Sequence, residues 1–120
     1  AIANNVVGTV SAKSADISME VLDGNSLDEK MVLYTKSDST VTVIFKDNSK
    51  LVLGSNAILN LKKYAFKPTK DEYAFELFLE AGSLSFESGK IGELSPEDFV
   101  LKTPDGTVAI RGTKFFIKVQ

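Results

Sequence analysis

Few side chains in this chain of 120 residues could carry acid–base, nucleophilic or metal chemistry. Histidine and cysteine are both absent, which excludes a Ser-His-Asp triad, a Cys-His pair and a zinc site built from these ligands. Paired carboxylates are the remaining route to catalysis, as in glycoside hydrolysis. Adjacent acids occur at Asp28-Glu29, Asp71-Glu72 and Glu97-Asp98. Each pair falls in a predicted turn, where a solvated surface role is expected. We therefore predict that the protein is not an enzyme and has no catalytic residues.

Oxygen ligands for calcium are the next chemistry to consider. Asp23-Gly24-Asn25 is followed closely by Asp28-Glu29, which brings several oxygen ligands into one loop region. The regular ligand spacing of an EF-hand is missing, so a plain turn is the preferred interpretation. Gly89-x-x-Gly92 is too common a spacing to indicate a phosphate-binding loop. We expect no metal ion and no cofactor.

Arg111 is the only arginine in the chain. Its forked guanidinium could hold a carboxylate or backbone carbonyls of a partner. It could instead reach across a turn, to carbonyls near Thr103 or to a nearby acid, and brace the last hairpin. The brace is favoured by neighbours that suit special backbone geometry, namely Pro104, Gly106, Gly112 and Thr113. The contact with a partner stays open as the alternative.

The apolar pattern changes phase around Arg111. Val108 and Ile110 share one parity, whereas Phe115 and Ile117 share the other. Side chains alternate strictly in a strand, so the core-facing set must slip by one residue between Ile110 and Phe115. Gly112 lies in this gap, where we expect a bulge or a close approach of the backbone.

The aromatic candidates for contact with a protein or a sugar are Tyr34, Tyr64, Phe66, Tyr73 and Phe116. Phe116 is out of phase with Phe115 and Ile117, so it should point away from the core that they face. Tyr64 flanks a lysine pair at the end of an alternating run. These aromatic side chains could instead form a second apolar layer beneath a neighbouring sheet, and because there are two faces to fill, this packing role is the preferred interpretation.

Alternating runs separated by Gly, Asn and Asp turns predict strands throughout the chain. The clearest hairpin signal is Asp47-Asn48, and the longest alternation runs from Tyr73 to Leu79. Strands spaced by ~8–12 residues indicate an all-β fold. We expect a small two-layer β-sandwich or solenoid-like domain of short, mostly antiparallel strands. Ser95-Pro96 is the one credible helix start, so we expect at most one short helical turn near residues 96–99.

Composition fits one domain over residues 1–120, because 43% hydrophobic residues can build one core. The net charge is −2 and the lysines are interleaved with acids, which argues against nucleic acid as a partner. No stretch approaches the ~20 apolar residues of a transmembrane helix, so we expect no direct membrane insertion by this segment.

Several short motifs follow one another along nearly the whole chain. They are Gly8-x-Val10, Ser39 to Phe45, Asp47-Asn48-Ser49, Leu51-x-Leu53, Leu59-x-Leu61, Gly82-Ser83-Leu84, Ser88 to Gly92, Thr103-Pro104, Ile110 to Thr113, Phe115 and Val119. In this order they resemble the FecR family of bacterial cell-envelope domains. Asn48 stands where the family usually has glycine in an Asp-Gly-Ser turn. Asparagine tolerates left-handed geometry well, so the turn should persist.

The resemblance implies a β-rich, partly solenoid-like domain located in the periplasm or at the bacterial cell surface. Regulators of this family receive a signal from an outer-membrane transducer and pass it to a sigma factor. We therefore expect a non-catalytic, extracytoplasmic protein-interaction module in envelope signal sensing or regulation. Its protein partner would be a transducer or neighbouring domains of the parent chain. The alternative is a structural or adhesive module of a large secreted or surface protein, which could contact polysaccharide. Addition of a strand at an open sheet edge would serve either role.

Overall fold

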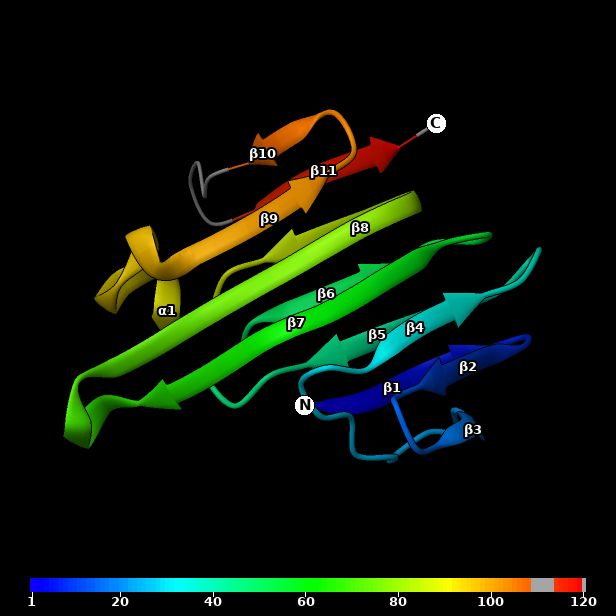
Figure 1. Cartoon of the computed structure of the whole chain (residues 1–120), viewed down its shortest axis with the longest axis horizontal. Helices are drawn as coiled ribbons and strands as arrows, with labels where there is room; N and C mark the ends of the chain where they lie inside the picture. The colour runs from blue at the N-terminus through cyan, green and yellow to red at the C-terminus, as the bar shows by residue number, and fades with distance from the viewer. Residues whose placement is uncertain (109–113, 120) are drawn as a thin grey trace.

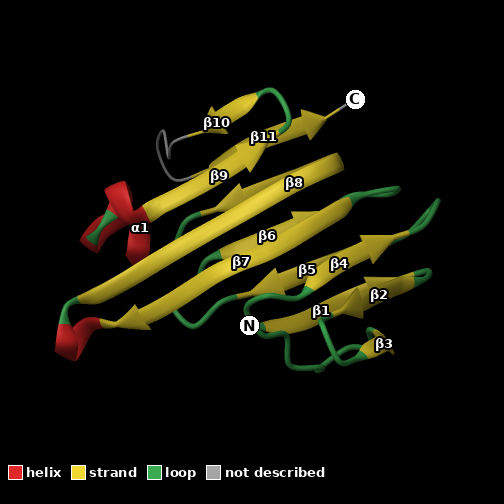
Figure 2. Cartoon of the chain, in the orientation of Figure 1, coloured by secondary structure: helices red, strands yellow, loops and turns green. Residues whose placement is uncertain are grey.

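The computed structural model describes residues 1–108 and 114–119, which are predominantly β (Figures 1 and 2). The strands are β1 (Ile2–Val7), β2 (Val10–Lys13), β3 (Ser18–Glu20), β4 (Val32–Thr35), β5 (Thr40–Ile44), β6 (Lys50–Leu53), β7 (Ile58–Lys67), β8 (Glu72–Glu87), β9 (Phe99–Thr103), β10 (Gly106–Val108) and β11 (Lys114–Val119). The helical segments are α1 (Lys90–Leu94) and the 3-10 turns η1 (Pro68–Lys70) and η2 (Pro96–Asp98). Within the described residues, hydrogen bonds join the strands into one eleven-stranded sheet.

Strand β8 connects the two arms of this sheet. Its first half pairs with β7 and β9, and its second half pairs with β6 and β11. Figure 1 shows β8 running along the molecule and turning back at one end. Gly82 has φ +88 at this bend, and a Cβ there would lie 2.5 Å from the Cα of Ala57. Only glycine accommodates both the left-handed backbone and this close approach, so Gly82 permits the sheet to curl into a half-barrel.

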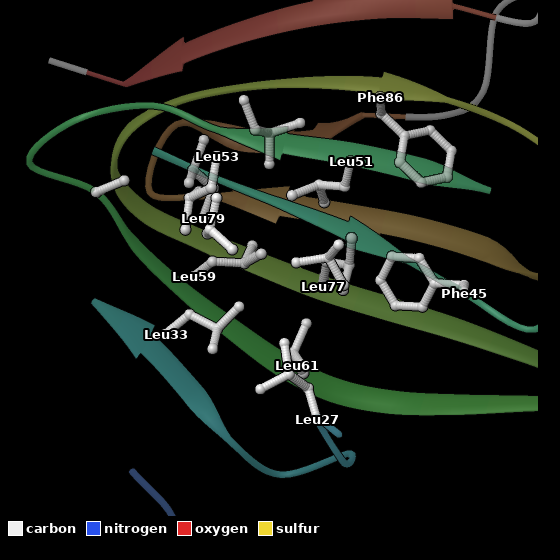
Figure 3. Close-up of a cluster of buried hydrophobic side chains, with 14 of the residues drawn as sticks. Leu27, Leu33, Phe45, Leu51, Leu53, Leu59, Leu61, Leu77, Leu79 and Phe86 are labelled. Carbon is white, nitrogen blue, oxygen red and sulfur yellow. The ribbon is translucent and has the colours of Figure 1, made fainter. Parts of the chain in front are cut away.

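Side chains from both arms fill the interior of the half-barrel. Figure 3 shows this cluster, in which leucines of β6 face leucines of β7 and of the first half of β8. The largest fully buried side chains are Phe75, Phe86, Leu27, Leu33, Leu51, Leu53, Leu59, Leu77, Leu79, Leu84, Ile91 and Leu101. Burial of one such side chain contributes about 1.5–3 kcal/mol. This cluster is therefore the main stabilising element of the fold.

Aromatic rings form one end of this core. The ring of Phe75 lies 4.6 Å from Phe45, 4.9 Å from Tyr64 and 5.1 Å from Phe99, measured between centroids. Phe86 continues the cluster and lies 5.5 Å from Phe115. These contacts join β7, β8, β9, β11 and the residue that follows β5, so the aromatic cluster connects the two arms.

The all-β, mostly antiparallel architecture predicted from the sequence is confirmed, and β8 with β9 is a parallel pair. The finer expectation of a sandwich or solenoid is not confirmed, because one curled sheet contains all the described strands. The expectation of short strands is wrong for β7 and β8, which have 10 and 16 residues. Ala81-Gly82-Ser83 resembles a turn in sequence, yet the glycine bends a continuous strand there.

The prediction of at most one short helical turn near residues 96–99 is also wrong. The 3-10 turn η2 (Pro96–Asp98) lies where it was expected, but α1 and η1 are two further helical segments. Helix α1 has Gly89 at its N-cap position with no side-chain capping bond. Tertiary contacts to Asp47 hold its start instead, and no local sequence signal predicts such contacts.

The Asp47-Asn48 hairpin signal of the sequence produces a hairpin. Asn48 lies between β5 and β6 with φ +68, so the left-handed turn persists as predicted. Thr103 pairs with Gly106 across the β9–β10 turn. The predicted register slip and the bulge at Gly112 fall at residues 109–113, which lie outside the described residues. Across residues 1–108 and 114–119, no helix has the length and apolar character needed to cross a membrane.

Candidate functional site

The structure describes four of the predicted site residues: Thr103 and Pro104 at the β9–β10 turn, Phe116 on β11 and Tyr64 on β7. Arg111, Gly112 and Thr113 lie outside the described residues. Thr103 and Pro104 form the start of the β9–β10 turn, where the Thr103 hydroxyl accepts from the Asp105 amide at 3.2 Å. The same hydroxyl donates to the Gly106 carbonyl at 3.3 Å. Thr103 therefore stabilises its own turn.

Phe116 and Tyr64 lie on strands that do not pair with each other. Phe116 on β11 is 65% exposed, which confirms that it points away from the core. Tyr64 on β7 is half-buried, and its ring packs 5.1 Å from Phe45 and 4.9 Å from Phe75. Tyr64 is thus part of the aromatic core as well as part of the surface.

Asp47 is a buried carboxylate that sequence reasoning assigned only to a turn. The residue is 1% exposed, and the two oxygens of its side chain accept four hydrogen bonds. Oδ1 accepts from the Ser49 amide at 3.1 Å and from the Tyr64 hydroxyl at 3.3 Å. Oδ2 accepts from the Ser49 hydroxyl at 2.7 Å and from the Ile91 amide at 2.9 Å. Such complete pairing is what makes burial of a carboxylate tolerable.

The backbone around Asp47 fastens the start of α1 to the β5–β6 hairpin. The Lys90 amide donates to the Asp47 carbonyl at 2.8 Å, and the Gly89 amide donates to the Ser49 hydroxyl at 2.8 Å. A Cβ at Gly89 would overlap the Asp47 carbonyl oxygen, so glycine is required for this approach. The Asp47-Asn48-Ser49 triplet is the available sequence signal, but its partners are about 40 residues away in the chain.

The hydroxyl of Tyr64 is held on this network from the other side. It accepts from the Asp47 amide at 3.1 Å and donates to Asp47 Oδ1 at 3.3 Å. Burial raises the pKa of the Tyr64 hydroxyl well above its usual range, and the nearby Asp47 carboxylate raises it further. The hydroxyl therefore stays protonated at neutral pH, where it accepts one hydrogen bond and donates another.

A hollow of about 330 Å³ opens beside the Tyr64 ring. Its lining residues are Ala1, Leu27, Asp28, Glu29, Phe45, Lys46, Leu61, Lys63, Tyr64 and Leu77. A second hollow, of about 270 Å³, shares several of these and extends along β7. It is lined by Glu29, Lys46, Lys63, Tyr64, Ala65, Phe66 and Lys67. We call the two together the Tyr64 groove: it has an apolar floor and a charged rim, which suits binding of a partly apolar, charged ligand.

The acidic pairs of the sequence have different surroundings. Asp28 and Glu29 lie on the rim of the Tyr64 groove. Glu72 lies 3.9 Å from Lys67 in an exposed ion pair. The Asp98 carboxylate accepts from the Ser95 hydroxyl at 2.5 Å beside η2. Among the described residues, no three acidic side chains lie close enough together to hold a metal ion.

Together, the curled sheet and the open groove define a small all-β domain with a surface suited to binding. The chain belongs to the FecR protein family, whose model matches residues 31–120. This family is associated with the bacterial cell envelope and with regulation of envelope signals. The match leaves out β1–β3 and with them the Gly8-x-Val10 motif. Neither the search of curated proteins nor that of solved structures returned a match.

Proposed function

We propose that this chain is a non-catalytic, extracytoplasmic protein-interaction domain in envelope signal sensing or regulation. The observation that carries the proposal is the Tyr64 groove, a hollow with an apolar, aromatic floor and lysines on its rim. Membership of the FecR family supports the signalling context, because the family acts in envelope regulation. The periplasm or the cell surface is the proposed location.

The groups around the groove support binding rather than catalysis. The Tyr64 hydroxyl is held protonated, and the Asp47 carboxylate is engaged with four donors inside the protein. Lys46, in the turn between β5 and β6, and Lys63, on β7, are exposed cations on the rim, which also carries Asp28, Glu29 and Lys67. Lysines at a rim attract and orient an acidic partner, which favours recognition of a protein surface.

We also propose that residues 1–120 act as one domain. Strand β1, which lies outside the family match, pairs with β5 through Ala3 and Val43. Val10 and Leu27 belong to the same buried cluster as the residues of the family match. Contacts of this kind support a common core for the first 30 residues and the rest.

A second contact region is proposed around the C-terminal signature. Phe116 is a large exposed aromatic side chain on β11, the strand that follows Arg111, Gly112 and Thr113. Exposed aromatic residues are frequent anchors at interfaces. Thr103 and Pro104 would shape the neighbouring turn in this proposal.

The test is direct titration of the protein with the purified periplasmic domain of an outer-membrane transducer from the same bacterium. Binding is expected, and Lys63→Glu should weaken it by about tenfold because a rim attraction becomes a repulsion. Lys36→Glu is the matched control, since Lys36 is exposed but lies outside the groove. Binding of envelope polysaccharide instead, lost on Phe116→Ala, would favour the structural or adhesive role.

A further inference from the structure

Strand β7 has an edge that its neighbour covers only in part. Strand β4 pairs with residues 58–60 of β7, and the segment before β4 adds bonds to Leu61. Beyond Leu61, β7 continues to Lys67 with β8 on one side. In residues 1–108 and 114–119, no strand pairs with residues 63–67 on the other side. Figure 1 shows the β7–β8 hairpin projecting past β4.

On this edge, the Glu29 side chain occupies the place where a further strand would pair with β7. Its Oε2 accepts from the Tyr64 backbone amide at 3.2 Å. The Tyr64 amide therefore points away from β8, toward the uncovered side. Alternate residues of a strand direct their backbone groups to the same side, so Phe66 presents its amide and carbonyl there too. Two residues of β7 are thus arranged to accept a further strand.

The charges beside this edge select the kind of strand. In the hollow along the edge, Lys46, Lys63 and Lys67 stand against the carboxylate of Glu29, whereas Asp28 lies in the other hollow of the groove. Lys67 is also 3.9 Å from the exposed Glu72, which leaves Lys46 and Lys63 as the principal cations. This local excess of positive charge occurs in a chain whose net charge is −2. An acidic segment complements it.

We propose that the Tyr64 groove binds an extended acidic peptide segment of a protein partner, which adds as a strand to β7. The peptide backbone bonds to Tyr64 and Phe66 and displaces Glu29 from the Tyr64 amide. One set of its alternating side chains lies over the aromatic floor, and the acidic set faces the lysines. This inference rests on the proposed function and specifies the binding mode of the same site.

A second copy of this chain is a poorer occupant of the same edge. Antiparallel pairing of β7 with another β7 would place Lys63 and Lys67 of one copy close to the same residues of the other. Like charges in opposed positions of a sheet are destabilising. The lysines therefore act against self-association and leave the edge open to an acidic strand.

The probe is a synthetic heptapeptide of alternating glutamate and valine, titrated into the ¹⁵N-labelled protein. We expect the amide resonances of Tyr64 and Phe66 to shift and to gain protection from hydrogen exchange. The matched lysine–valine peptide should bind at least about tenfold more weakly, and the Lys46→Glu/Lys63→Glu variant should reverse this order. Glu29→Ala should tighten binding by about two- to threefold, because no displacement is needed.

Two N-methylated peptides test the strand pairing itself. One carries methyl groups on the glutamate amides and the other on the valine amides. Because only alternate residues of an added strand direct their amides toward β7, one of the two peptides cannot donate to it. That peptide should lose binding. Equal binding of the two methylated peptides, absence of binding by the acidic peptide, or shifts confined to other strands would each overturn the inference. The Lys36→Glu/Lys50→Glu variant has the same change of net charge at exposed lysines outside the groove, and it should bind like the unaltered protein.

The transducer titration separates this inference from the proposed function. If the transducer domain binds and Lys46→Glu/Lys63→Glu does not weaken it, the binding mode is wrong while the function stands. If neither the transducer domain nor the acidic peptide binds, the proposed function fails as well. Circular dichroism and thermal unfolding of each variant establish that it is folded before titration.

Discussion

Tyr64 and Asp47 are joined by two hydrogen bonds although 17 positions separate them in sequence. The phenol oxygen accepts from the Asp47 amide at 3.1 Å, and its proton is directed to Asp47 Oδ1 at 3.3 Å. This pairing attaches β7 to the turn between β5 and β6. The floor of the groove and the buried carboxylate are therefore parts of one unit.

Tyr64→Phe should destabilise the protein by about 1–3 kcal/mol, because it leaves the Asp47 amide without its acceptor. Chemical unfolding at neutral pH measures this difference. Tyr34→Phe is the matched control, since Tyr34 is also half-buried on a strand of the same arm and no hydrogen bond involves its hydroxyl among the described residues. Equal stability of Tyr64→Phe and the unaltered protein would contradict the role of the hydroxyl.

Alkaline pH should lower stability through Tyr64. The folded state raises the pKa of this hydroxyl above its usual value of 10.0, so above that pH the unfolded chain loses the proton first. The folded state then holds more protons, and the free energy of unfolding falls as pH rises. Unfolding measured from pH 8 to 11 should show a smaller decline for Tyr64→Phe. Identical slopes for the two proteins would refute this assignment.

Asp47→Asn should be more damaging, with a loss of about 3 kcal/mol or more. In asparagine an NH₂ group replaces one carboxylate oxygen, and this nitrogen cannot accept a hydrogen bond. If it takes the place of Oδ2, the Ser49 hydroxyl and the Ile91 amide both lose their buried acceptor. Hydrogen exchange should rise first at α1, whose start depends on Asp47. Asp105→Asn, in an exposed turn, is the control and should change stability by less than about 0.5 kcal/mol.

Gly82→Ala and Gly24→Ala form a matched pair that isolates the close approach at the bend of β8. Both glycines have nearly equal φ values, +88 and +87. A Cβ at Gly82 would meet Ala57 at 2.5 Å, whereas a Cβ at Gly24 would meet nothing within 4 Å. Gly24→Ala should cost about 1–2 kcal/mol from backbone strain alone. Gly82→Ala should cost at least about 3 kcal/mol, and thermal unfolding of the two variants should show this ranking.

Arg111→Lys distinguishes a brace from a partner contact. If Arg111 braces the last hairpin, loss of its forked geometry should lower the melting temperature by several degrees, about 1 kcal/mol in stability. An unchanged melting temperature together with lost binding of the transducer domain would show that the brace is wrong. Lys114→Arg, which restores a guanidinium three positions away, should not rescue the variant.

Sequence reasoning succeeded where the signal is local. The alternation through Phe75 and Leu77 predicts an inward face, and both side chains are 1% exposed. Asn48 predicts a left-handed turn residue because its side chain tolerates that backbone, and its φ is +68. The alternating pattern of β11 alone predicts that Phe116 lies outside the core, and this side chain is 65% exposed. The two-residue period of the apolar pattern and the identity of the turn residues are sufficient to predict such elements.

Long-range features were not accessible in this way. The sequence makes Tyr64 a candidate for either contact or packing, but its bond to Asp47 depends on how β7 lies against the β5–β6 turn. The sequence around Asp47 indicates only a turn residue, because the Ile91 amide that donates to its side chain lies 44 positions later. Helix α1 forms for the same reason, with no cap of its own. The groove combines residues from the loop before β4, from β5–β6 and from β7, so no single stretch predicts it.

The position of β8 also governs the order in which this chain can fold. Strands β6 and β7 both pair with β8, and β8 ends only at Glu87. Until the chain up to Glu87 has reached the compartment where the domain folds, the two arms lack the strand that connects them. Their apolar inner faces stay open to mispairing during that interval. Protection from aggregation is therefore most useful before Glu87 becomes available for pairing.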